Sequence, residues 1–174
     1  MKPPFLPRVL ARIQGQDLTL IAPNVIQFRG DVDIDADGSG PNAYTDARGR
    51  IWKDRYYQPD TSLHFRGKAL NSQTVPYAVV PPAVLVGVPG IVLGCLVWVT
   101  NRKTGKRVAC VCGDTGPTAK VGEVSIEAAR RLGVDPNPVI GGDDDFEFDY
   151  EVHAGVPAVI DGITYDLQPF RKAA

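Results

Sequence analysis

The sequence contains few of the residues that usually mark a metal or redox site. It has 3 cysteines, 2 histidines and 1 methionine in 174 residues. Cys110 and Cys112 form a Cys-x-Cys pair, but a structural zinc site needs four ligands at regular spacing, and Cys95, His64 and His153 are distant from that pair. We therefore expect no metal site and no cofactor. The cysteines are interpreted as reduced core residues, and the pattern leaves a Cys95–Cys112 disulfide open.

The chain also lacks an excess of charge of either sign. It has 19 Lys and Arg against 20 Asp and Glu, for a net charge of -1. A nucleic-acid-binding protein usually presents a basic face to phosphates, so we expect no nucleic-acid partner. The first residues lack the continuous apolar core of a signal peptide, and the localisation stays open from these residues alone.

No charged residue occurs between positions 74 and 101, a stretch long enough to span a bilayer. Four prolines and three glycines, however, divide it into short pieces. The pattern favours buried strands at 75–80 and 91–100 joined by a proline-rich turn, and we expect no membrane span.

Regular helical periodicity is scarce, whereas glycine (18) and proline (15) are abundant. Both features favour a β-rich fold with many turns, as one domain over residues 1–174 with its core at about 17–167. Further strands are predicted at 18–21 and 25–28 around a Pro23-Asn24 turn, at 106–112 in a hairpin with 91–100, at 146–153, and in a terminal hairpin of 158–160 with 163–167.

One helix is clearly predicted, over residues 125–132. Ser125 is a typical N-cap, basic residues fill the last turn, and Gly133 is a typical stop. The polar, turn-rich segment 38–60 is predicted to be a long surface loop. Its aromatic residues suit either stacking on sugar rings or anchoring of the loop, and they are Tyr44, Trp52, Tyr56 and Tyr57.

Acidic residues are clustered at positions 31–37 and 143–151. Such runs form solvated loops, or they line a negative cleft for a cationic ligand. The segment from Asp33 to Gly38 also resembles the start of an EF-hand loop. Position twelve would be Tyr44, where calcium needs a bidentate Glu, so only a calcium site of a different design stays open.

Asp114 and Glu123 form the most informative pair of acids. Asp114 follows the apolar strand at 108–112, a turn comes next, and Glu123 opens the predicted helix. This arrangement can aim two carboxyl groups into one cleft, as glycoside hydrolysis requires. The spacing alone is equally compatible with a residue that begins a turn and a residue at a helix start.

Four segments in fixed order give this pair a context. They are Phe28-Arg-Gly-Asp-Val-Asp-Ile-Asp-Ala-Asp-Gly38, Val75-Pro-Tyr-Ala-Val-Val80, Cys112-Gly-Asp-Thr-Gly-Pro117 and Val121-Gly-Glu-Val-Ser-Ile-Glu-Ala-Ala129. Together they resemble the glycoside hydrolase family 75 chitosanases, from about Phe28 to His153. The chain departs from the family in its last strand, where Tyr-Glu-Val-His replaces a more apolar form, and in showing no secretion signal.

The resemblance implies an endo-acting, inverting enzyme that cleaves β-1,4 links of chitosan. It implies that Asp114 and Glu123 are catalytic and that substrate is bound by Asp33, Asp35, Asp37, Thr115 and Tyr77. We further expect a monomer without a cofactor, and the family resemblance favours secretion. The alternatives are cleavage of another polysaccharide such as peptidoglycan, and a non-catalytic carbohydrate-binding or structural module.

Burial after an apolar strand favours Asp114 as the general acid, and the helix start favours Glu123 as the base, with the reverse left open. The strand-end Asp resembles that of double-psi β-barrel hydrolases. The expected fold is therefore mainly β: a six-stranded double-psi β-barrel-like domain with inserted loops and one short helix.

Overall fold

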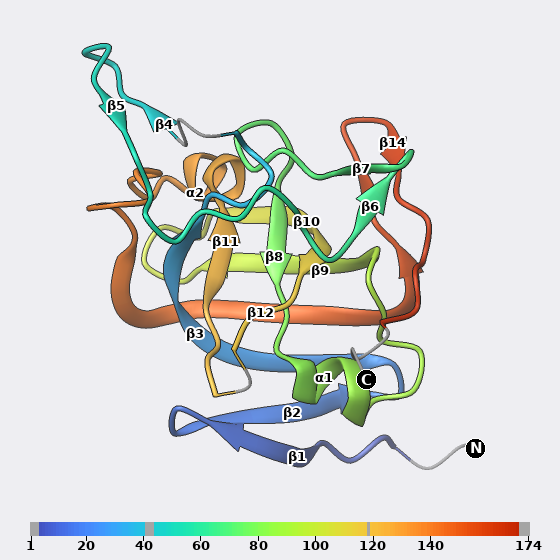
Figure 1. Ribbon diagram of the computed structural model, residues 1–174. Helices are drawn as coiled ribbons and strands as arrows, with labels where there is room; N and C mark the ends of the chain where they lie inside the picture. Colours follow the sequence, from blue (N-terminus) through green and yellow to red (C-terminus); the bar gives the residue numbers. More distant parts are fainter. Residues whose placement is uncertain (1–3, 41–43, 118, 171–174) are drawn as a thin grey trace.

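The computed structural model describes residues 4–40, 44–117 and 119–170. Within these ranges the chain is mainly β, with one large sheet, three two-stranded hairpins and two short helices (Figure 1). The large sheet has the strand order β1-β2-β3-β11-β8-β10-β9-β12.

Six of these strands close into a barrel, because β12 also pairs with β3. They are β3 (Val25–Asp35), β8 (Tyr77–Val79), β9 (Cys95–Asn101), β10 (Arg107–Asp114), β11 (Glu123–Ser125) and β12 (Asp143–Pro157). A hairpin of β1 (Arg8–Ile13) and β2 (Gln16–Ala22) extends the sheet beyond β3. The prediction of a mainly β fold built on a six-stranded barrel is confirmed.

The smaller elements lie in the connections between barrel strands and after the last barrel strand. They are the hairpins β4 (Tyr44–Thr45) with β5 (Ile51–Trp52), β6 (His64–Phe65) with β7 (Lys68–Ala69), and β13 (Val159–Ile160) with β14 (Ile163–Thr164), together with α1 (Pro82–Gly87) and α2 (Ile126–Leu132). The β4–β5 hairpin projects away from the barrel (Figure 1). It occupies part of the segment predicted as a long loop, of which residues 41–43 lie outside the described residues.

Most barrel strands lie where the sequence predicts them, whereas β1 and β11 were not predicted as strands. β3 continues through the acidic segment to Asp35, and β12 begins before and ends after the predicted 146–153. The expected turn between 80 and 91 contains α1, which begins at Pro82, a residue well suited to the first helical position. No helix among the described residues is long and apolar enough to cross a membrane.

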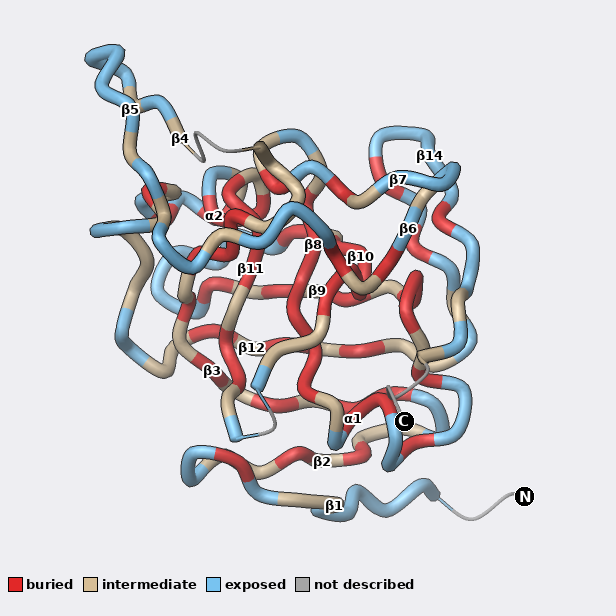
Figure 2. Tube along the Cα trace, in the orientation of Figure 1, coloured by how far each residue is buried: buried red, intermediate tan, exposed pale blue. Residues whose placement is uncertain are grey.

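The core lies inside the barrel and under α2 (Figure 2). Alternation along β9 buries Cys95, Val97 and Val99, as expected for a strand with one face in the core. Phe28 of β3 stacks on Tyr150 of β12 with ring centroids 5.1 Å apart, across the pairing that closes the barrel. All three cysteines are free and buried, which agrees with reduced core thiols.

Ser125 joins the short barrel strand β11 to α2. Its Oγ accepts a hydrogen bond from the Ala128 N–H at 3.2 Å, which makes it the helix N-cap that the sequence predicts. The same oxygen accepts from the Tyr77 N–H at 3.0 Å and donates to the Val75 carbonyl at 2.8 Å. Gly133 ends the helix with φ of 75°, a left-handed conformation that favours glycine.

Replacing Ser125 with Ala should therefore lower the free energy of unfolding by roughly 2 kcal/mol, since the cap is lost and a buried N–H of β8 is left without a partner. Urea unfolding at pH 7 measures this change. Thr104→Ala, which alters an exposed hydroxyl in the β9–β10 turn, is the control and should change stability by less than about 0.5 kcal/mol. An equal effect of the two variants would contradict the structural role of Ser125.

Candidate active site

Asp114 and Glu123 lie in one row across four neighbouring strands. Glu123 is in register with Asp33 on β3 and with Val79 on β8, and Val79 is in turn in register with Asp114 on β10. Adjacent strands are about 4.8 Å apart, so the two acids are separated by two strand spacings, roughly 9–10 Å between Cα atoms. Residues in register project from the same face, and the sheet therefore aims both acids the same way.

A bulge and two glycines place these acids. The β8–β10 register shifts between Cys112 and Asp114, so that Asp114 rather than Gly113 pairs with Val79. A Cβ on Gly113 would lie 2.6 Å from the Tyr77 Cβ, and one on Gly122 would lie 2.6 Å from the Asp31 carbonyl oxygen. Only glycine allows these close approaches, immediately before each acid.

Asp114 is 7% exposed and is held by three donors. Its Oδ1 accepts from the Ser62 N–H at 3.0 Å, the Ser62 hydroxyl at 2.6 Å and the Thr115 N–H at 2.7 Å. The Ser62 and Thr115 hydroxyls are themselves 3.0 Å apart. Burial raises the pKa of Asp114, and the hydrogen bonds from Ser62 and Thr115 oppose that rise because they stabilise the ionised carboxylate.

Glu123 has a different environment. Burial is the main cause that raises its pKa to about 7, and Asp33, Asp114 and Asp37 add to it. The Lys120 ammonium acts in the opposite direction. Lys120 is paired with Asp33, so an ion pair lies directly beside the glutamate. A carboxyl group with this pKa is still partly protonated near neutral pH.

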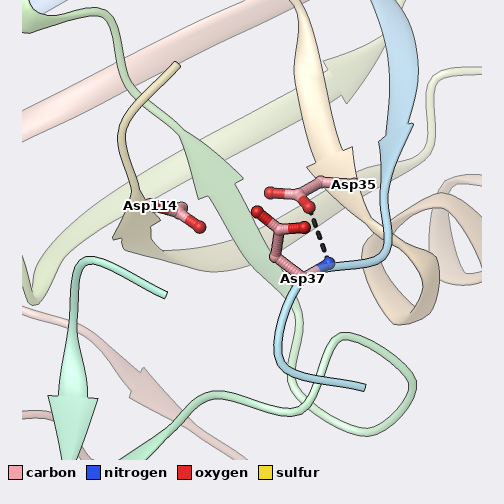
Figure 3. Close-up of side chains that lie close together, drawn as sticks. All are labelled: Asp35, Asp37 and Asp114. Carbon is pink, nitrogen blue, oxygen red and sulfur yellow. Dashed lines mark hydrogen bonds between the residues drawn. The ribbon is translucent and has the colours of Figure 1, made fainter. Parts of the chain in front are cut away.

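Asp114 is also part of a cluster of three carboxyl groups, together with Asp35 and Asp37 (Figure 3). One oxygen each of Asp35, Asp37 and Asp114 lie within 4.8 Å of one another. The Asp35 Oδ1 accepts from the Asp37 N–H at 2.8 Å, and the Asp37 Oδ1 accepts from the Gln58 N–H at 2.7 Å. Burial raises the pKa of Asp37 to about 6 and that of Asp35 well above its ordinary value.

Carboxylate oxygens of this kind are ligands for hard cations such as Ca²⁺. The cluster differs from an EF-hand loop, because its third carboxylate comes from β10 rather than from the continuing loop. Like-charged groups this close cannot all ionise readily without a counter-charge, and the raised pKa values show that protons can supply the neutralisation.

Two surface cavities lie near the acids. One, of about 500 Å³, is lined by Glu123, Asp33 and Lys120 together with Asp54 and Tyr56. The other, of about 550 Å³, is lined by Ser62, whose hydroxyl binds Asp114, and by Phe170 near the end of the described chain. Only the first of these cavities has one of the two acids among its described lining residues.

The structure brings together Asp33, Asp35, Asp37, Asp114, Thr115 and Glu123, all named from the sequence. Tyr77 is also adjacent, but it is fully buried, and its hydroxyl donates to the Asp37 carbonyl at 3.2 Å. This position is that of a support beneath the cluster, because Tyr77 has no exposed surface to offer a ligand.

Sequence reasoning missed two neighbours of the acids. Ser62 contacts Asp114 across 52 positions of sequence, and no local pattern around it indicates this role. Lys120 had a usable signal, since it lies three residues before Glu123, between the two segments that carry the acids.

Comparison of the chain with models of known protein families and with curated proteins finds no match.

The raised pKa of Asp37 predicts a change in stability. The folded protein binds this proton up to about pH 6, whereas the unfolded chain releases it near pH 4, so ionisation destabilises the fold progressively over that window. Asp37→Asn keeps an acceptor for the Gln58 N–H. It should raise the free energy of unfolding at pH 7.5 by roughly 1–2 kcal/mol, allowing for solvent screening, with little change at pH 3.5.

Urea unfolding of both proteins at several pH values measures the difference. The control is Asp143→Asn, which removes a partner of Lys103 on the surface and should not stabilise the protein at any pH. A stabilisation of Asp37→Asn that is independent of pH would contradict the assignment to the carboxyl proton.

Proposed function

We propose that the protein is a glycoside hydrolase that cleaves β-1,4 links of chitosan by an inverting mechanism. The observation that carries the proposal is the row of Asp33, Glu123, Val79 and Asp114 across four strands. It projects the carboxyl groups of Glu123 and Asp114 from the same face of the sheet, and the two groups have different surroundings. Inverting enzymes place their carboxyl groups about 6.5–9.5 Å apart so that a water fits between one of them and the sugar. Two strand spacings are compatible with that range.

The environments support Glu123 as the general acid and Asp114 as the general base. This is the reverse of the assignment favoured by the helix start and by burial after a strand. Glu123 has a pKa of about 7 and keeps the proton that the leaving oxygen needs. Asp114 accepts three hydrogen bonds on one oxygen, which favours the ionised form that activates water.

In the proposed reaction the Glu123 proton passes to the glycosidic oxygen as the bond to the anomeric carbon breaks. A water between the sugar and Asp114 forms the new bond from the opposite face and gives its proton to the Asp114 carboxylate. The ring oxygen shares the positive charge that develops at the anomeric carbon. Ionised carboxylates at this site stabilise that charge electrostatically.

The local charge supports a cationic substrate. Asp33, Asp35, Asp37 and Asp114 lie near the reacting region, where Lys120 is the one basic side chain among the described lining of the cavity beside Glu123. Glucosamine units are ammonium ions at mildly acidic pH, so they are attracted where a neutral sugar is not. Ammonium groups also compensate the mutual repulsion of the clustered carboxylates.

The resemblance to family 75 chitosanases and the double-psi type of barrel belong to the same proposal. Two parallel pairs, β3–β11 and β8–β10, flank the antiparallel pair β8–β11. This arrangement supports a double-psi barrel, with the "GDT" segment on β10 and the "GE" segment on β11, the two strands that flank β8.

The first experiment measures the release of reducing ends from chitosan by the wild type, Asp114→Asn and Glu123→Gln. Each substitution keeps the shape of the side chain but removes its acid–base function, so activity should fall by about 100-fold or more. Asp145→Asn, which changes an exposed acid paired with Lys103, should remain fully active. Proton NMR of the first products should show the inverted anomer.

Peptidoglycan and chitin are included as alternative substrates in that assay. Cleavage of either one in preference to chitosan would reject the proposed substrate. No hydrolysis of any substrate by the wild type, or full activity of both catalytic-site variants, would reject the proposed function.

The second experiment measures kcat/KM against pH. With Glu123 as the acid, activity should fall as pH rises through about 7, because the required proton is lost. Lys120→Met removes a cation that lowers the pKa of Glu123, so the alkaline limb should move to higher pH. Lys120→Arg and the distant Lys103→Met should leave the limb in place, and a shift of Lys120→Met to lower pH would contradict this assignment of roles.

A further inference from the structure

The cavity beside Glu123 extends beyond the reacting groups. Its volume is about 500 Å³, within the usual range of small-molecule sites. Asp33, Lys120 and Glu123 line it from the barrel, Asp54 and Tyr56 from the segment between β5 and β6, and Val139 from the loop after α2. The outer residues take no part in the proposed reaction.

The outer walls of this cavity present apolar surface to solvent. Tyr56 is 76% exposed and Val139 is 48% exposed. Their neighbours in the cavity are charged. A pyranose ring has the matching character, with C–H faces that stack on aromatic rings and polar groups around its edge.

Tyr56 has a backbone conformation that is fixed before any ligand binds. Its backbone N–H donates to the Asp54 Oδ1 at 2.8 Å, which fixes the turn between the two residues. Two residues later, the Gln58 N–H donates to the Asp37 Oδ1, and the Gln58 carbonyl accepts from the Gly38 N–H at 3.0 Å. The segment is therefore tied directly to the carboxylate cluster, and a ligand would not have to order it on binding.

Charge narrows the choice of ligand. Asp33, Asp54 and Glu123 contribute three carboxyl groups to the cavity, and Lys120 is already paired with Asp33. Apart from Glu123, the proposed general acid, Asp54 is thus the carboxyl group of the cavity wall that is not paired with that lysine. It lies two residues from the exposed ring of Tyr56, so an aromatic platform and an anionic group occur together.

We infer that Tyr56 and Asp54 form a binding subsite for a glucosamine unit next to the bond that is cut. The sugar ring stacks on Tyr56, and its ammonium group pairs with Asp54. The inference rests on the proposed function, because it names the sugar that the same cleft selects. It assigns to these two residues the discrimination between a free amine and an N-acetyl group.

The test measures binding of the β-1,4-linked glucosamine hexamer by calorimetry in the Asp114→Asn background, which lowers hydrolysis and leaves this cavity unaltered. Tyr56→Ala should weaken binding about tenfold, as expected for loss of a buried aromatic contact. Tyr56→Phe should stay within about twofold. Asp54→Asn keeps an acceptor for the Tyr56 N–H, and it should weaken binding about fivefold through loss of charge.

The N-acetylglucosamine hexamer and Phe5→Ala are the controls. Asp54→Asn should not change binding of the acetylated hexamer, and Phe5→Ala removes a partly exposed aromatic outside the cavity, so it should change nothing. Unchanged binding in Tyr56→Ala, equal loss for both hexamers in Asp54→Asn, no effect of Asp54→Asn on the glucosamine hexamer, or no binding of that hexamer would each overturn the inference.

These outcomes separate the subsite from the reaction. If the wild type cuts chitosan while Tyr56→Ala and Asp54→Asn bind like their parent, the subsite is wrong and the proposed function stands. If binding depends on both residues but the wild type releases no reducing ends, the subsite stands and the proposed function fails.

Discussion

The hydrogen bonding of β11 is the constraint on which the candidate site depends. This strand has three residues, and it pairs with β3 on one side and with β8 on the other. Glu123 begins it and Ser125 ends it, so one short ladder sets the position of an acid and the start of α2. A slip of one residue would turn Glu123 to the opposite face and remove the helix cap at the same time. The hydrogen bond of 2.8 Å from the Asp33 N–H to the Gly122 carbonyl extends the ladder and secures its register.

Around this strand the protein gathers more carboxyl groups than its stability favours. Asp35 and Asp114 are each 7% exposed, and burial raises the pKa of both. The rigid barrel and the fully buried Tyr77 hold the groups together against their repulsion. Such tension is expected where carboxyl groups must differ in protonation, because acid–base chemistry needs one proton donor and one acceptor at the same pH. Among the described residues, three hydrogen bonds stabilise the ionised form of Asp114, whereas the Glu123 carboxyl group accepts none.

Local signals in the sequence were sufficient for several elements. The N-cap Ser125 and the stop at Gly133 located α2, and a Lys-Thr-Gly turn located the β9–β10 hairpin. Alternation along β3 buries Val32 and Ile34, but Asp35, which alternation places on the opposite face, is buried as well. The exception arises because the chain leaves the sheet at that point and is covered by the segment that carries Gln58 and Ser72. That segment is distant from Asp35 in sequence, so alternation along β3 could not predict the burial of Asp35.

The sequence by itself determined the β-rich class and the helix, since capping, alternation and turn chemistry act over a few residues. It singled out Asp114 and Glu123 only through the order of four segments, because their spacing alone fits ordinary turn and helix-start roles. Only the tertiary structure decided that Asp114 and Glu123 share one row, because that follows from a bulge after Cys112 and from pairing of strands far apart in the chain. It also decided the environment of each acid. Burial raises the pKa of Glu123, while Ser62 and Thr115 donate hydrogen bonds that stabilise the Asp114 carboxylate, so each pKa depends on neighbours in space rather than on neighbours in sequence.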